Sequence, residues 1–128
     1  MGRGLRIGLA GVVAAASLSV APWAAANDDD VIREGACSGS SDWKLKLSPE
    51  NGKIEVEFEV DQNVVGDEWR VVMRHEGDVF FRGKRTTQGP SGSFEVRRVE
   101  PNLAGTDSFR ARARNLDGDE VCRGSASF

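Results

Sequence analysis

The sequence predicts an all-β protein, specifically a seven-stranded antiparallel β-sandwich, on the basis of three observations. From Trp43 onward, apolar residues recur at every second position, as they do in strands with one buried and one solvent-facing side. Turn-forming residues interrupt these runs roughly every 8–12 positions. The helical period of about 3.6 residues is not found in the same region. These features together favour short strands packed as two facing sheets.

The first two predicted strands are "WKLKL" and "IEVEFEV", separated by the turn residues "SPENG". A two-residue loop at Asn51-Gly52 sets Leu47 against Val56, so that apolar residues meet on one side. The same register pairs Leu45 with Phe58, Lys46 with Glu57 and Lys44 with Glu59. A slip by one residue would set apolar residues opposite charged ones on both sides of the hairpin. A four-residue loop preserves the matches, so the pairing is predicted while the loop length stays open.

The next two predicted strands are "EWRVVMR" and "VFFRGKRTT", on either side of the turn "EGD". A three-residue loop sets Met73 against Phe81 and Val72 against Arg82. After the break "GPSGS", the alternating run "SFEVRRV" predicts a fifth strand, and "EPNLAGTD" is a longer connection.

The last two predicted strands are "SFRARARN" and "EVCRGSASF", joined by a turn at Asp117-Gly118. This register sets three inward pairs, namely Ala113 with Cys122, Ala111 with Gly124 and Phe109 with Ala126. The small inward residues leave room for a disulfide and for tryptophan rings. We expect Trp43, Phe58, Trp69 and Phe109 to be core residues.

Residues 1–26 have the three-part pattern of a cleaved secretory signal peptide, which predicts a secreted, extracellular protein. Arg3 and Arg6 precede an apolar run, and Ala24 to Ala26 supply the small residues at which a signal peptidase cleaves. The alternative is a membrane anchor, but the apolar run is shorter than the ~20 residues of a spanning helix. A lipoprotein attached at Cys37 is a further alternative, disfavoured because Glu34 occupies a position where an apolar residue is expected.

The mature chain is predicted to consist of a flexible acidic segment, residues 27–35, followed by one β-sandwich domain, residues 36–128. Removing Arg3 and Arg6 from the 17 basic residues leaves 15 against 20 acidic residues, a net charge of −5. Overall attraction to nucleic acids or to an anionic membrane is therefore not expected.

The mature chain contains two cysteines, Cys37 and Cys122, which allow one intramolecular disulfide. An even number of cysteines in a small protein outside the cytosol is typical of a disulfide. A cysteine-based metal site lacks further ligands, since His75 is the only histidine. We therefore predict a disulfide between the two ends of the domain.

The strand pattern resembles immunoglobulin-like and fibronectin type III modules. It is also similar to small secreted actinobacterial proteins of unknown function, which share "CSGSSDWKLK" near the start of the domain and "EVCRG" near its end. The resemblance implies that the first, second and fifth strands form one sheet. The remaining strands would form the other, with the last strand, the sixth, the third and the fourth side by side. The chain departs from the immunoglobulin pattern in its predicted disulfide, which would join the first and last strands rather than the second and sixth.

No motif in the sequence indicates catalysis, a cofactor or a metal. The sequence has no motif that presents a nucleophile for which His75 could act as a base. His75 is therefore expected to be an exposed residue at the end of a strand. Glu55, Glu57 and Glu59 share the solvent-facing side of one strand opposite lysines, which favours ion pairing over glycoside hydrolysis. The acidic stretches "NLDGDE" and "NDDD" are too short for a calcium loop. We predict that the protein is not an enzyme.

Arginines dominate the solvent-facing positions of the sheet that the resemblance implies. A candidate anion-binding face therefore consists of Arg70, Arg74, Arg82, Lys84, Arg110, Arg112, Arg114 and Arg123. The plainer interpretation is that these arginines only solvate the sheet, with their stems on its surface and their charged groups in water. Sequence-specific recognition of nucleic acid is not expected, because no known motif is present.

The sequence thus predicts a secreted, non-catalytic binding or accessory protein of the cell envelope or extracellular space, whose partner is an unknown protein or an anionic envelope polymer. The alternative is a secreted inhibitor of an extracellular hydrolase, presenting the loop from Thr86 to Ser93. A purely structural module is a third possibility. No membrane span is expected after cleavage of the signal.

Overall fold

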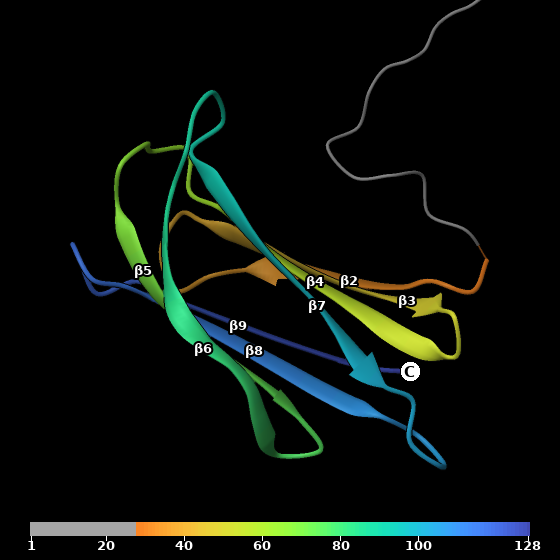
Figure 1. The fold of residues 1–128 in the computed structure, drawn as a ribbon. Helices are drawn as coiled ribbons and strands as arrows, with labels where there is room; N and C mark the ends of the chain where they lie inside the picture. Colours follow the sequence, from red (N-terminus) through yellow and green to blue (C-terminus); the bar gives the residue numbers. More distant parts are fainter. Residues whose placement is uncertain (1–27) are drawn as a thin grey trace, which may run out of the picture.

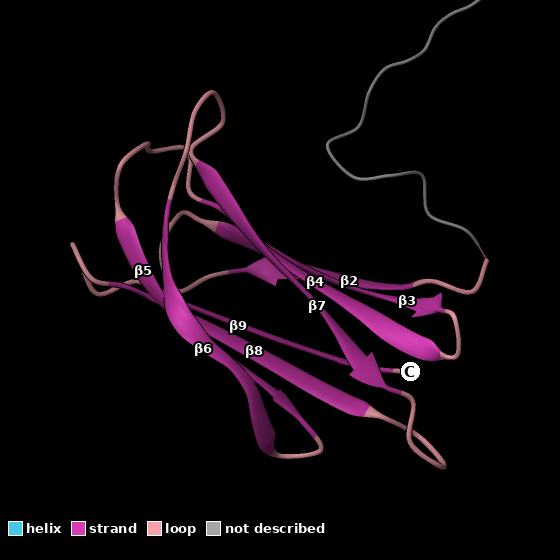
Figure 2. Cartoon of the chain, viewed as in Figure 1, coloured by secondary structure: helices cyan, strands magenta, loops and turns pink. Residues whose placement is uncertain are grey.

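The computed structural model describes residues 28–128, which form two four-stranded antiparallel sheets and contain no helix (Figure 1). Figure 2 shows that loops and turns connect strands throughout this region. The strands are β2 (Val31–Ala36), β3 (Asp42–Glu50), β4 (Lys53–Asp61), β5 (Glu68–His75), β6 (Asp78–Thr86), β7 (Ser93–Pro101), β8 (Ser108–Asn115) and β9 (Val121–Ser127). One sheet has the order β2-β3-β4-β7 and the other the order β6-β5-β8-β9. The signal peptide predicted for residues 1–26 lies outside the described residues.

The register predicted for the β3–β4 hairpin is confirmed, and its loop has two residues. Glu50 pairs with Lys53, and Leu47 pairs with Val56. The loop residues Asn51 and Gly52 have φ angles of 50° and 79°. Asparagine and glycine tolerate this left-handed conformation best, which explains the choice of residues at this turn.

The pairs predicted for the second sheet are confirmed, but the three-residue loop predicted for the β5–β6 hairpin is wrong. Met73 pairs with Phe81 as predicted, whereas His75 pairs with Asp78, so the loop has two residues and an irregularity between Met73 and Arg74 absorbs the difference. On the other side of the sheet, Ala113 of β8 pairs with Cys122 of β9. The division of the seven predicted strands between two sheets also agrees with the expectation, because β3, β4 and β7 share one sheet.

The two sheets enclose one apolar core. Phe58, Trp69 and Phe109 are fully buried in it, as predicted. Trp43 is only half-buried, but its ring fills the space beside two glycines. A β-carbon added at Gly35 would lie 2.8 Å from this ring, and one added at Gly124 would lie 2.7 Å from it. The small residues of β2 and β9 thus make room for a tryptophan from β3.

The expectation of seven strands and a flexible segment 27–35 is wrong at β2, an eighth strand within the described residues. β2 pairs antiparallel with the edge of β3 over its whole length, from Val31 opposite Leu47 to Ala36 opposite Asp42. Its sequence, "VIREGA", lacks the alternation that identifies the other strands. The strand forms because the β3 backbone offers hydrogen bonds and because the disulfide immediately follows it.

Two charged residues expected on a solvent-facing surface are instead buried. Lys46 and Glu57 are each only 4% exposed, in the central strands of their sheet. Their charges are paired there. The Lys46 amine lies 3.7 Å from Asp30, and Arg97 lies 3.5 Å from Glu57 and 3.4 Å from Glu55.

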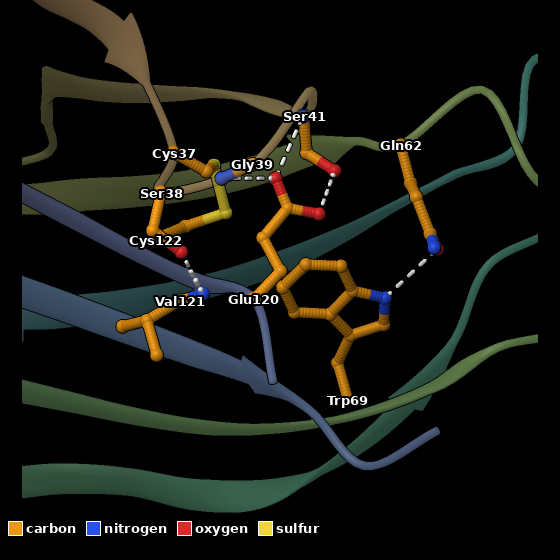
Figure 3. The surroundings of a disulfide bond; sticks show 9 residues. All are labelled: Cys37, Ser38, Gly39, Ser41, Gln62, Trp69, Glu120, Val121 and Cys122. Carbon is orange, nitrogen blue, oxygen red and sulfur yellow. Dashed lines mark hydrogen bonds between the residues drawn. A yellow bond between two sulfur atoms is a disulfide. The ribbon is translucent and has the colours of Figure 1, made fainter. Parts of the chain in front are cut away.

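The predicted disulfide between Cys37 and Cys122 joins the two sheets across 85 residues of sequence (Figure 3). Cys37 lies in the connection between β2 and β3, just outside the strand expected to carry it. Hydrogen bonds reinforce the same junction. The Glu120 carboxylate accepts bonds from Gly39 and Ser41, with the Ser41 amide at 2.7 Å.

Candidate anion-binding face

Alternate residues of β5, β6, β8 and β9 point away from the core and form transverse rows across the outer side of their sheet. From β6 to β9 the rows consist of Val79, Arg74, Arg110 and Ser125, then Arg82, Val72, Arg112 and Arg123, then Lys84, Arg70, Arg114 and Val121. The structure therefore brings all eight residues predicted for the anion-binding face onto one surface, here called the basic face. Arg114 is half-buried and the other seven are exposed.

Like charges stand directly opposite one another on the basic face. Three arginine pairs occupy facing positions on neighbouring strands, namely Arg70 with Arg114, Arg74 with Arg110, and Arg112 with Arg123. Neighbouring strands lie about 4.8 Å apart. Like charges in such positions destabilise a sheet.

The acidic residues near the basic face are used at the strand ends, where they bind backbone amides. Glu76 accepts a hydrogen bond from the Ser108 amide, and Asp117 accepts one from the Glu68 amide. Among residues 28–128, the basic face has one ion pair, between Lys84 and Glu68 at 4.0 Å, and both side chains are about half exposed. The Arg74 guanidinium donates a hydrogen bond to the Gly77 carbonyl at 3.1 Å, and Arg70, Arg82, Arg110, Arg112 and Arg123 are exposed to solvent.

A shallow depression of about 630 Å³ lies in the middle of the basic face. Its lining consists of Arg70, Val72, Arg74, Arg82, Arg110, Ala111, Arg112, Arg123, Gly124 and Ser125. Val72 is the apolar residue at the centre of the rows, with Arg70 and Arg74 before and after it on β5. Arg82 and Arg112 face it from the neighbouring strands. The surface thus combines a small apolar floor with a cationic rim.

The outer side of the other sheet has the opposite character. Glu55, Glu57 and Glu59 of β4 project there together with Glu95 of β7, which faces Glu59. Burial raises the pKa of Glu57, and its hydrogen bond to Glu95 raises it further. Burial likewise raises the pKa of Glu55, helped by its proximity to Glu57. These four carboxylates are interleaved with Lys44, Lys46 and Arg97, so this surface mixes both signs of charge where the basic face does not.

His75 is not the exposed histidine that the sequence predicts. It is 6% exposed, and its ring stacks on Phe109 with centroids 4.2 Å apart. Nε2 lies 2.7 Å from a carboxylate oxygen of Asp107, and Nδ1 lies 3.0 Å from one of Glu100. Sequence reasoning missed this cluster because both acids lie in or beside the irregular connection after β7, whose course no local pattern specifies.

The geometry around His75 favours the protonated ring. A neutral imidazole has one N–H and can donate to one carboxylate, whereas an imidazolium can donate to both. Burial by itself lowers the pKa of His75, but the hydrogen bonds and charges of Asp107 and Glu100 outweigh it, so the pKa is raised above 6.5. Both ring nitrogens are occupied, and the cluster acts as an ionic link between β5 of one sheet and β7 of the other.

The two acidic stretches considered as calcium sites do not gather into a metal site in the part of the chain that the structure describes. In "NLDGDE", Asn115 is buried and donates a hydrogen bond to Asp67, and its side-chain oxygen accepts one from the Asp117 amide. The hydrogen bonds that the side chains of Asn115 and Gln62 donate to Asp67 lower the pKa of the Asp67 carboxyl group. Most of the stretch "NDDD" lies within residues 28–128, where Asp30 pairs with Lys46.

The loop from Thr86 to Ser93, the alternative site, is braced against the β4–β5 connection. Thr87 is buried, and its hydroxyl accepts a hydrogen bond from the Asp67 amide at 3.0 Å. The Gly92 carbonyl accepts bonds from the amides of Gln62 and Asn63. The exposed side chains of Val64 and Val65 lie at the same end of the molecule.

Comparison with known proteins adds no relative to this description. No protein-family model matches the chain, and no curated protein or solved structure shows significant similarity to it. The class of protein is therefore defined by its structure, as a two-sheet all-β domain with an inter-sheet disulfide and one strongly basic sheet surface.

Proposed function

We propose that this protein is a secreted, non-catalytic binding protein with an immunoglobulin-like sandwich fold, and that it holds anionic polymers outside the cytosol through its basic face. The observation that carries the proposal is the set of three directly opposed arginine pairs on the sheet β6-β5-β8-β9. Arginine forms paired hydrogen bonds with phosphate and carboxylate groups, which makes it well suited to such a ligand.

Repulsion between the opposed arginines lowers the stability of the free protein, and a bound anionic ligand relieves that repulsion. Repulsion between facing cations destabilises the sheet, and an anion placed between them converts this repulsion into attraction. Of the nearby acids, Glu76 and Asp117 are bonded to backbone amides at the strand ends, and Glu68 pairs with Lys84 rather than with an arginine. The net charge of −5 expected for the mature chain limits long-range attraction, so binding depends on local contacts screened over about 8 Å at physiological salt.

The proposed location has two supports. The disulfide between Cys37 and Cys122 is consistent with an oxidising, extracellular compartment. No helix within residues 28–128 is long and apolar enough to cross a membrane. The sequence pattern of residues 1–26 supplies the route of export.

Inhibition of an extracellular hydrolase is the second candidate function. The observation in its favour is the bracing of the loop Thr86–Ser93 by the β4–β5 connection, because a loop held in one conformation loses little entropy on binding. Replacing Pro90 and Ser91 at the tip tests this function without touching the basic face. Loss of inhibition in the loop variant, with polymer binding intact, would assign the activity to the loop.

The proposed function is tested by measuring binding to phosphate-rich and carboxylate-rich polysaccharides at low and moderate salt. The test variant R110Q/R112Q removes two charges from the basic face, and the matched control K53Q/R98Q removes two exposed charges carried by the other sheet. Because the Arg98 guanidinium also lies 4.5 Å from the centroid of the Phe81 ring of β6, thermal unfolding verifies that the control is folded. We expect roughly fivefold to tenfold weaker binding for the test variant alone, with the difference shrinking as salt rises. Equal binding by all three proteins, or none by any, would contradict the proposal.

A further inference from the structure

The outward arginines of β8 form a regular line, defined here as the β8 arginine track (Arg110, Arg112 and Arg114). We infer that this track binds a linear phosphodiester polymer with a three-carbon bridge between successive phosphates, one phosphate to each arginine. The inference rests on the proposed function and goes beyond it by naming the chemical class and repeat length of the ligand.

The first argument is spacing. Alternate residues of a strand lie roughly 6.8 Å apart, because each residue advances about 3.4 Å. Two residues of extended backbone contain six bonds. A phosphodiester chain with a three-carbon bridge has the same number of bonds from one phosphorus atom to the next. The phosphates of an extended polymer of this type therefore have about the same spacing as Arg110, Arg112 and Arg114 along the strand.

The second argument concerns the neighbours of the track. Arg70 and Arg74 of β5 face the ends of the track, while Val72 faces its middle. Arg123 of β9 supports the middle from the other side. Each phosphate thus lies near a facing pair of arginines, and the apolar floor at Val72 lies beside the carbon bridges. The phosphates of the ligand would contact arginines, and its carbon bridges would contact the apolar side chain of Val72.

The third argument distinguishes this ligand from single-stranded nucleic acid, whose sugar-phosphate chain has a similar repeat. Proteins that bind single strands place aromatic side chains where bases stack on them. The outward positions of β5, β8 and β9 carry no aromatic residue within the described structure. Phe80 of β6 is half-buried, with its ring packed edge-on against Phe109. The face therefore suits a phosphate polymer without bases.

The experiment compares the variants R112Q and R82Q of the full mature protein. Both remove one exposed charge from the same row of the basic face, but only Arg112 belongs to the track, and Val72 lies between the track and Arg82. Binding is measured to poly(glycerol phosphate), which has a three-carbon bridge, and to poly(ribitol phosphate), which has a five-carbon bridge. An oligothymidylate with the same number of phosphates is the third ligand. Thermal unfolding of each variant verifies that it is folded.

We expect the native protein to bind the three-carbon polymer most tightly. R112Q should weaken that binding about fivefold and R82Q less than twofold. The five-carbon polymer should bind more weakly and discriminate little between the variants. Equal losses for both variants on both polymers would overturn the track while leaving the proposed function in place. Tighter binding of the oligothymidylate would assign the face to nucleic acid and overturn the choice of ligand. Absence of binding to every polymer would overturn the proposed function as well.

Discussion

The outer surfaces of the two sheets differ in how their charged residues face one another. On β3 and β4, Lys44 faces Glu59 and Lys46 faces Glu57, so opposite charges meet across the strands. On β5, β8 and β9, arginine faces arginine in three pairs. Complementary cross-strand pairs stabilise a sheet and like pairs destabilise it. The first sheet also has like pairs, Glu59 with Glu95 and Asp42 with Asp61, but its central pairs join opposite charges. The charged pairs across β5, β8 and β9 join arginines only, which is the reason for proposing that this face binds a ligand.

The disulfide holds the two surfaces in one rigid unit, and its removal should have the largest effect. Replacing Cys37 and Cys122 with serine should lower the free energy of unfolding by roughly 4–5 kcal/mol, because closing so long a loop restricts the unfolded chain. Chemical denaturation of the native and variant proteins measures the change. Thiol titration of the native protein should find no free thiol, and two free thiols would contradict the disulfide.

The buried tryptophan of β5 carries the next largest effect. Trp69 lies in the core with its indole nitrogen 3.0 Å from the Gln62 side-chain oxygen (Figure 3). The centroid of its ring lies 6.1 Å from that of Phe94. Changing it to alanine should cost about 3–5 kcal/mol of stability, the usual range for a buried aromatic residue. A change within experimental error at Trp69 would mean that the core is packed differently.

The ionic link at His75 should make stability depend on pH. Because the pKa of His75 is raised in the folded protein, its contribution is fully present below about pH 6.5. It is lost as the pH rises through the folded pKa, where the ring becomes neutral and faces Asp107 and Glu100 with one N–H. His75→Gln should lower stability by about 1–3 kcal/mol at pH 6 and by less at pH 9. Denaturation at both pH values measures the difference, and a constant difference would contradict the protonated link.

The smallest effects test the charge rule itself. Arg97→Gln removes ion pairs to Glu55 and Glu57 and should cost about 0.5–1 kcal/mol. Arg112→Gln removes repulsion with Arg123 and should leave stability unchanged or raise it by a few tenths of a kcal/mol. Denaturation at low salt gives the sign of each change. Destabilisation of similar size by both variants would mean that the basic face is ordinary sheet solvation.

Much of the second sheet could be predicted because its information is local. Alternation along "EWRVVMR" and "SFRARARN" specifies which side chains point outward, and the turn residues specify the register of each hairpin. Cross-strand neighbours such as Arg112 and Arg123 follow from those registers alone. Predicting which residues form the basic face required one further assumption, that β5 lies beside β8. The resemblance to immunoglobulin-like modules supplied that assumption.

The sequence by itself determined the all-β class, three hairpin registers, the disulfide partners and the outward arginines. The class, the registers and the arginines depend on residue type and spacing within short segments, and the disulfide partners follow from the presence of two cysteines. Only the tertiary structure decided that Val31–Ala36 forms a strand, that Lys46 and Glu57 are buried, and that His75 lies between two carboxylates. These features depend on which distant segments become neighbours. A polar strand is stabilised by the edge it joins, and a histidine is charged or neutral according to acids that approach from another sheet.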